Sequence, residues 1–151
     1  VQQPDRSSGI RVETGSQATE GTLVTVEGTL ATKPSGERFL QEAQILSPTP
    51  GTSAIPMGAR CSAIGSSDAG PDNVGLLMRS WGRVTSAGEG FVTVNDGSLP
   101  GDGLKVTAPA GVMLPVTGTM VGVTGVVQLE GTAPGSRPVL RIRRASDVTV
   151  F

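Results

Sequence analysis

The sequence predicts an all-β protein, and three features of its 151 residues support this fold class. Turn-forming residues recur every few positions, with 22 glycines and 11 prolines in the chain. Apolar and polar residues alternate with the period of two that marks a strand with one buried face. No window keeps apolar residues at helical spacing for three turns. We therefore expect helix to be minor or absent.

The alternation is clearest in three segments. They are Val24 and Val26 with Thr25 and Glu27, then Val121, Val123 and Val127 with Gly122, Thr124 and Val126, and finally Leu140 and Ile142 with Arg141 and Arg143. Further strands are expected at 77–86, 90–95, 104–107 and 146–151, with turns at 87–90 and 96–97. Residues 47–75 show no sustained alternation and are rich in Gly, Pro and Ser, so they predict a long loop or linker.

Composition excludes several classes of chemistry. The chain has no histidine, which removes imidazole triads and zincin motifs. Its single cysteine, Cys61, excludes an intrachain disulfide framework and any cysteine cluster for a metal. No Walker loop, dinucleotide fingerprint or nucleophile elbow is present. We therefore expect a protein that is not an enzyme and needs neither a cofactor nor a metal.

Charge and composition also bear on partners and location. The formal net charge is -1, so no global positive field attracts nucleic acid or anionic lipid. The uncharged run between Lys105 and Glu130 could span a bilayer by length, but prolines, glycines and strand-like alternation exclude a membrane helix. Few lysines, no tyrosine and abundant Gly, Thr, Val and Ser favour an extracellular protein. The first residue, Val1, is compatible with a processed N-terminus, a trimmed chain or an excerpt of a longer one.

Self-comparison reveals an internal repeat. Residues 9–12 match 103–106, residues 21–28 match 118–125, and residues 34–40 lie opposite 134–140. The second copy has two extra strands ahead of its shared part, whereas residues 1–3 correspond to 94–96, just after the second of those strands. The first copy therefore lacks the counterparts of both strands.

The second copy resembles bacterial OB-fold modules, which are five-stranded Greek-key barrels. The resemblance rests on Trp-Gly-Arg-Val at 81–84, Asp-Gly-Ser at 96–98 and Gly-x-x-Val-x-Val-x-Gly at 118–125, in that order. It implies a complete barrel at 76–151, with the first two strands at 76–98 and the others at 103–109, 118–131 and 137–151. Residues 9–46 resemble the third to fifth strands of a second module. We thus predict a partial OB-like unit at 1–46, a linker at 47–75 and a complete OB-like barrel at 76–151.

The missing strands leave open edges and an uncovered apolar face on the partial unit. That face carries Leu23, Val24, Val26, Phe39, Leu40 and Ile45. The partial unit could pack on the barrel of its own chain, a neighbouring copy could donate a strand, or the missing strands could lie upstream of a shortened chain. Strand donation joins two different patches, so it propagates head to tail into a filament or ring. Residues 1–8 and 47–75 are the candidate donor segments.

An OB fold also suggests oligonucleotide binding through stacking aromatics and basic side chains. The candidate residues are Arg79, Trp81 and Arg83 on one strand, Arg141 and Arg143 on another, and Phe91 and Lys105 beside them. The competing interpretation is that Trp81 packs internally while the arginines are solvated or paired with Glu27, Glu37 or Glu130. Three Phe, one Trp and no Tyr make a poor stacking platform, so nucleic-acid binding is disfavoured.

Two groups of acidic residues near glycines are candidate calcium-binding sites. The two groups are Asn95, Asp96 and Asp102, and Asp68 with Asp72. Their spacing fits no EF-hand loop, and Asx turns explain both.

Taken together, the residue types, the charge and the unequal repeat predict a non-catalytic, extracellular structural protein that self-associates through its incomplete unit. The alternatives are a single-stranded nucleic-acid-binding module and a carbohydrate- or adhesion-type module.

Overall fold

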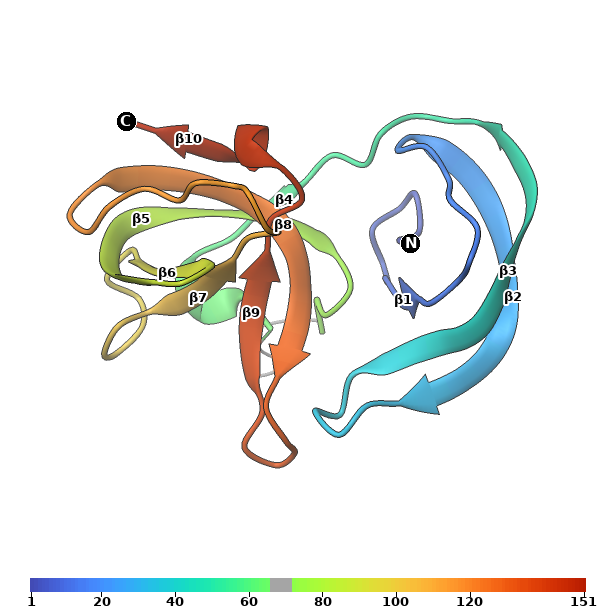
Figure 1. The fold of residues 1–151 in the computed structure, drawn as a ribbon, viewed down its shortest axis with the longest axis horizontal. Helices are drawn as coiled ribbons and strands as arrows, with labels where there is room; N and C mark the ends of the chain where they lie inside the picture. The colour runs from blue at the N-terminus through green and yellow to red at the C-terminus, as the bar shows by residue number, and fades with distance from the viewer. Residues whose placement is uncertain (66–71) are drawn as a thin grey trace.

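The computed structural model describes residues 1–65 and 72–151 and consists largely of strands (Figure 1). Strands make up 48% of it and helix 4%, which confirms the all-β prediction. The strands form two sheets: a three-stranded sheet of order β1-β3-β2, and a seven-stranded sheet of order β10-β8-β9-β7-β6-β5-β4 in which β8 also pairs with β5. The second sheet therefore closes on itself.

Five strands form this closed barrel. They are β5 (Leu77–Gly88), β6 (Phe91–Asn95), β7 (Leu104–Thr107), β8 (Met120–Glu130) and β9 (Arg137–Arg141). Going round the barrel, β5, β6, β7, β9 and β8 follow one another, and β8 pairs with β5. All these pairs are antiparallel except β7 with β9. This arrangement is compatible with an OB-like fold, and it confirms the predicted five-stranded barrel.

The barrel interior follows from the alternation in the sequence. Every second residue of a strand points inward, and here those positions hold β-branched and aliphatic side chains. The innermost of them are at most 1% exposed: Val84, Val92, Val94, Val106, Val121, Val123, Val127, Leu140 and Ile142. Apolar burial of this kind is the dominant force holding the barrel together.

Short elements extend the barrel at both ends of its sheet. β4 (Met57–Gly58) pairs parallel with β5, and β10 (Val148–Val150) pairs antiparallel with β8 after the 3-10 turn η2 (Ala145–Asp147). A second 3-10 turn, η1 (Cys61–Ala63), places Cys61 in the barrel core. The segment predicted as a loop at 47–75 thus contributes ordered pieces to the barrel, and its residues 66–71 lie outside the described part.

The other sheet is open. It contains β1 (Arg11–Val12), β2 (Thr22–Thr32) and β3 (Arg38–Pro50), with β1 parallel and β2 antiparallel to β3. Two register shifts interrupt the β2–β3 pairing, and both put an extra residue on β3, at Glu42 (φ 51°) and Ser47 (φ 47°). Such bulges bend a strand and increase its twist. Figure 1 shows the result: β2 and β3 curve around the N-terminal segment, which lies between them and the barrel.

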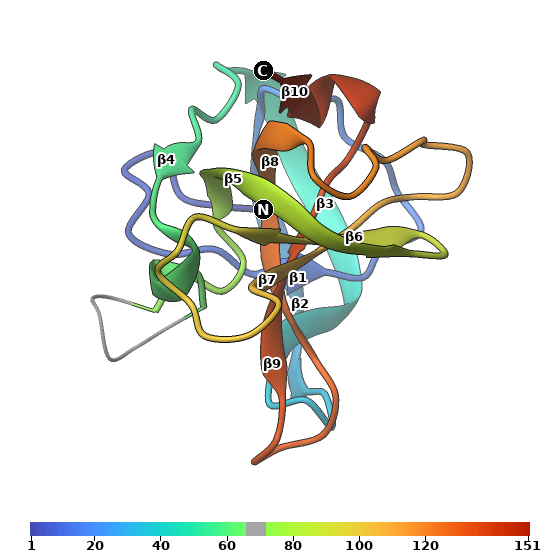
Figure 2. The ribbon, with the colours of Figure 1, turned by 90° about the vertical axis from the view of Figure 1, so that its left-hand side faces the viewer.

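The two units are in contact, and Figure 2 shows β2 and β3 behind the barrel when the molecule is turned by 90°. Gly9 and Gly75 meet so closely that a Cβ on Gly9 would lie 2.3 Å from the carbonyl oxygen of Gly75. The Ala133 N–H donates to the Pro34 carbonyl oxygen at 2.9 Å. Among the described residues, no helix is both long and apolar enough to cross a membrane.

Candidate functional site

Around Leu40 of the open sheet and Leu140 of the barrel, the strands pair in the same way. In the parallel pairs, Val12 faces Leu40 in the open sheet and Val106 faces Leu140 in the barrel. In the antiparallel pairs, Leu30 faces Leu40 and Val127 faces Leu140. β1, β3 and β2 therefore stand in the relation of β7, β9 and β8, with the same partners at the same positions of the sequence alignment.

The two units differ in what covers their edges. In the barrel, β5 pairs with the other edge of β8, aligning residues 77–83 with 120–126, and β6 pairs with β7. In the open sheet, β2 and β1 are the end strands, and no other strand of the described part pairs with them. The backbone N–H and C=O groups along the outer edge of β2 are thus available to another strand.

A cavity of about 680 Å³ lies beside the open sheet. Six of its lining residues are Ile10, Val12, Val24, Val26, Leu30 and Leu40. Their alignment counterparts are Leu104, Val106, Val121, Val123, Val127 and Leu140, which are at most 2% exposed. The cavity is also lined by the N-terminal segment, at residues 1–4, 8 and 9, and by Val74 and Leu129 from the barrel side.

The residues predicted for the uncovered face divide into two groups. Leu23, Val24, Val26 and Leu40 line the cavity, and the Leu23 side chain is 54% exposed. Phe39 and Ile45 do not line it. Phe39 immediately precedes Leu40, so its side chain lies on the opposite face of β3, with Lys33 Nζ 5.0 Å from its ring centre. Leu30, which is 48% exposed, also lines the cavity and is absent from the predicted set. Its even spacing from Val24 and Val26 was the available signal.

Lys33 is itself held by a carboxylate. Its Nζ lies 3.0 Å from Glu13 Oε1, and Arg11 Nε approaches the same oxygen at 3.3 Å. The hydrogen bond from Lys33 lowers the pKa of Glu13. Because Glu13 also exchanges backbone hydrogen bonds with β3 at Leu40 and Ala43, this cluster secures the short β1 side of the open sheet.

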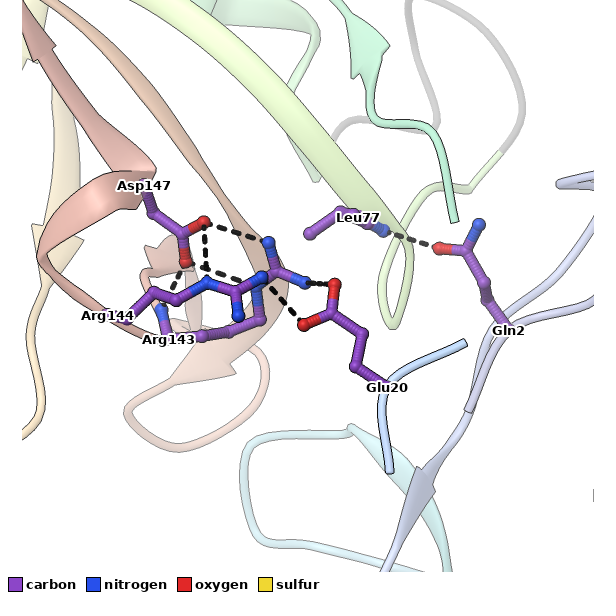
Figure 3. Close-up of polar contacts among 6 residues, drawn as sticks. All are labelled: Gln2, Glu20, Leu77, Arg143, Arg144 and Asp147. Atoms are coloured by element: carbon purple, nitrogen blue, oxygen red, sulfur yellow. Dashed lines mark hydrogen bonds and ion pairs between the residues drawn. The ribbon is translucent and has the colours of Figure 1, made fainter. Parts of the chain in front are cut away.

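Polar contacts fasten the open sheet to the barrel (Figure 3). Gln2 Oε1 accepts a hydrogen bond from the Leu77 N–H at 2.8 Å, at the first residue of β5. Glu37, which is 4% exposed, accepts one from the Leu129 N–H at 3.1 Å. Each contact satisfies a backbone donor at the boundary between the units, where an unpaired buried N–H costs about 1–3 kcal/mol.

Two arginines complete this boundary. Glu20, two residues before β2, bridges Arg143 Nη1 and Arg144 Nη2, each at 2.7 Å (Figure 3). Arg143 also binds Asp147 through Nε, Nη2 and its backbone N–H at 2.8–3.1 Å. Burial acts to raise the pKa of Asp147, but the Arg143 hydrogen bonds and charge outweigh it and lower the pKa. The hydrogen bond with Asp147 raises the pKa of Arg143.

A second cavity of about 1050 Å³ opens between the units. Leu23 and Val24 line it from the open sheet, Val126 and Arg141 from the barrel, and Ile55 from the connecting segment. The Ile55 side chain is 72% exposed. The two units therefore touch through a limited set of contacts and enclose unfilled space between them.

The predicted ligand face is not one surface. Arg79, Trp81 and Arg83 share the outer face of β5, where the Trp81 side chain is 50% exposed and aligned with Gly122 of β8. Lys105 Nζ instead lies 4.9 Å from the Phe91 ring centre and 2.6 Å from Glu130 Oε2. Arg141 lines the cavity between the units, and Arg143 is engaged by Asp147 and Glu20.

In the acidic turn that follows β6, both carboxylate oxygens of Asp96 have hydrogen-bond partners within the chain. Asp96 Oδ1 accepts hydrogen bonds from the Ser98 N–H and hydroxyl, and Oδ2 accepts one from the Cys61 N–H at 3.0 Å. The Cys61 side chain is 1% exposed, and burial raises the pKa of its thiol. Asp68 lies outside the described residues. Within the described residues, no three His, Cys, Asp or Glu side chains gather in a way that could hold a metal ion.

Comparison with known proteins adds no relative: no protein-family model matches the chain, and no curated protein is similar to it. The class that the fold defines is thus an all-β chain with a closed five-stranded barrel and a separate three-stranded sheet. The site with the clearest unmet physical requirement is the open edge of β2 together with the cavity of about 680 Å³ beside it.

Proposed function

We propose that this protein is a non-catalytic, extracellular structural protein that self-associates by adding a strand from a neighbouring copy to its open sheet. The open sheet is, in this proposal, an incomplete second copy of the barrel module. The observation that carries it is the cavity lined by the counterparts of six buried barrel residues. This cavity lies next to β2, whose outer edge pairs with no strand in the part of the chain that the structure describes.

The composition of β2 supports this proposal. Edge strands that must stay single are commonly protected by lysine, proline, bulges or a short length. β2 is 11 residues long, contains neither lysine nor proline, and has Glu27 as its single charged residue. Both bulges of this sheet lie on β3 rather than on β2. The edge is therefore regular and suited to pairing.

Residues 1–8, one of the two predicted donor segments, are engaged within their own chain. The Gln3 N–H donates to the Ser8 carbonyl oxygen at 2.9 Å, and the Ile10 N–H donates to the Val1 carbonyl oxygen at 2.8 Å. This fold-back turn leaves the donated strand to come from elsewhere. Since donor and acceptor are then different surfaces of one chain, the contact repeats head to tail and yields a filament or a ring.

The test compares two leucine substitutions of similar exposure. Leu30→Lys places a charge in the cavity, whereas Leu46→Lys places one on β3 at a residue that lines neither cavity. Leu30 is 48% exposed and Leu46 37%, so both variants should fold. We expect light scattering and negative-stain microscopy to show assemblies for the parent and for Leu46→Lys, and monomers for Leu30→Lys. A parent chain that stays monomeric at high concentration contradicts the proposal.

Binding of single-stranded nucleic acid is the second candidate, and the exposed Trp81 between two arginines favours it. Stacking of a base on an aromatic ring contributes about 1–3 kcal/mol. If this function holds, Trp81→Ala weakens oligonucleotide binding by about tenfold or more, and affinity falls steeply with salt. Lys105→Gln is the matched control, because Lys105 is already paired with Glu130. Equal binding by all three chains excludes the Trp81 face.

A further inference from the structure

Exposed apolar side chains on the strands fall into two groups. One lies on the edge strand β2 of the open sheet, at Leu23 and Leu30, whereas Leu46 lies on the inner strand β3. The other lies on neighbouring strands of the barrel: Trp81 on β5, Met120 on β8, and Val150 with Phe151 at β10. Val150 is 59% and Phe151 74% exposed. A chain that carries two separate apolar groups on its strands has two candidate interaction surfaces.

The barrel group includes a strand edge with which no other strand of the described residues pairs. β10 pairs with β8 on one side and is the end strand of the sheet on the other. The Phe151 N–H donates to the Met120 carbonyl oxygen at 3.0 Å. Because successive N–H groups of a strand point to opposite edges, the Val150 N–H points to the free edge. Figure 1 shows β10 on the far side of the barrel from β2 and β3.

Charge distinguishes the two ends of the molecule. Residues 1–50 carry six acidic and four basic side chains, whereas residues 76–151 carry seven basic and five acidic ones. Glu27 and Glu42 lie exposed on the open sheet, and Arg79 and Arg83 lie exposed beside the barrel group. Contact between two open sheets would bring like charges together, while contact between an open sheet and a barrel brings opposite charges together.

We infer that the free edge of β10 in a second copy of this chain is the strand that adds to the free edge of β2. This inference rests on the proposed self-association and names the surface that the second copy contributes. Strand alternation then places Val150 on the cavity side of the joined sheet, near Val24 and Val26. Phe151 then lies on the opposite face of the joined sheet. The joined strands give a heterologous contact.

The experiment uses full-length variants blocked at one surface each. Val150→Pro removes the outward N–H of β10 without removing a bond to β8, and a proline with its nitrogen at a free edge is tolerated. Val150→Thr keeps that N–H and is the matched control. We expect Val150→Pro to remain monomeric, like Leu30→Lys, and Val150→Thr to assemble like the parent. Circular dichroism and thermal melting check that each variant folds.

Mixing the two blocked chains gives the decisive result. Val150→Pro retains an intact β2 edge, and Leu30→Lys retains an intact β10 edge, so one productive contact remains between them. We expect the equimolar mixture to give a dimer of about twice the 15.3 kDa chain mass, and neither chain to dimerise alone. A mixture that stays monomeric overturns the inference, because two correctly assigned surfaces must pair once.

A second substitution leaves the β10 backbone unchanged. Phe151→Asp charges the exposed ring position, and Met113→Asp is the control on a loop residue that is 92% exposed. We expect the assembly midpoint to rise at least tenfold in concentration for Phe151→Asp and to stay within twofold for Met113→Asp. If the parent assembles and the β10 variants assemble equally well, the proposed function stands and the β10 assignment is wrong. If the parent never assembles, both are wrong.

Discussion

The barrel and the open sheet place equivalent residues in very different surroundings. Val127 of the barrel is completely buried, whereas Leu30, its counterpart opposite Leu40, is 48% exposed. The pairing of the neighbouring strand is the same in both places. What differs is the presence of β5 and β6, which close the barrel over Val127. Burial of a strand residue therefore depends on the completeness of its sheet as well as on its own hydrophobicity.

The comparison has an energetic side. Full burial of one Val or Leu side chain contributes about 1.5–3 kcal/mol relative to full exposure. In the barrel, Val106, Val127 and Leu140 are fully buried and make this contribution in full. In the open sheet, Val12, Leu30 and Leu40 are only partly buried and make a smaller contribution. The open sheet consequently depends more on its contacts with the barrel, such as those of Gln2 and Glu37.

The largest expected effect comes from truncating one leucine in each unit. Leu140→Ala should lower the free energy of unfolding by about 2–5 kcal/mol, because it leaves a hole in a closed core. Leu40→Ala should cost less than half as much in dilute solution, since Leu40 already borders a cavity. Urea denaturation of the dilute chain, followed by tryptophan fluorescence and circular dichroism, measures both. Equal losses would mean that the open sheet has a filled core in solution.

A smaller effect distinguishes the two carboxylates on Arg143. Asp147 belongs to the barrel and is 7% exposed, and hydrogen bonds to charged groups contribute about 1.5–3 kcal/mol each when buried. Glu20 comes from the segment before β2 and its side chain is 38% exposed. An ion pair of such exposure contributes about 0.2–1 kcal/mol. Asp147→Asn should therefore destabilise the chain more than Glu20→Gln in the same denaturation assay.

Acid titration sharpens this difference. The pKa of Asp147 in the folded chain lies below the ordinary value of 3.8, so the unfolded chain takes up its proton first. The stability that Asp147 contributes is fully present above that value and is lost as the pH falls through the lowered pKa. Between about pH 5 and pH 2, the unfolding free energy of the parent should fall more steeply than that of Asp147→Asn. Parallel curves would contradict the role of Asp147.

The smallest effect is expected at two equivalent glycines. A Cβ on Gly125 would lie 2.6 Å from the Arg141 carbonyl oxygen inside the barrel, while one on Gly28 would meet the Ala43 Cβ at 3.0 Å. We expect Gly125→Ala to cost about 1–3 kcal/mol, because the closed wall has to shift. Gly28→Ala should cost clearly less, since β2 can move outward at its free edge. Thermal melting of both variants compares them directly.

Alternation was a reliable guide where strands have one buried face. It located β2, β8 and β9, and the motif order located the barrel that β5 to β9 form. It gave no signal for residues 57–64, where a two-residue strand and a 3-10 turn carry Cys61 and Ile64 into the core. Elements this short show no period, and their burial depends on tertiary contacts such as the one between the Cys61 N–H and Asp96.

The candidate sites were predictable to different extents. The separate three-stranded sheet was predictable from counting strands. That this sheet is an incomplete module with an uncovered face stays a prediction. The roles of Arg141 and Arg143 were not predictable, because neighbouring arginines in a strand pattern do not reveal which carboxylate approaches from another unit. Glu20, which engages Arg143 and Arg144, is more than 120 residues away in sequence. The bulges at Glu42 and Ser47 likewise lack the glycine that usually marks a positive φ.

Opening of the barrel can be detected by chemical labelling of the buried Cys61 thiol. Its Sγ lies 3.3 Å from the Ser80 hydroxyl and has Asp96 beside its backbone, so a modifying reagent reaches it only when this part of the barrel separates. The thiolate is the reactive form, and burial keeps this group protonated. The rate of Cys61 labelling thus measures how often the barrel opens around this thiol. The open sheet has no cysteine, so its unfolding does not change the labelling rate.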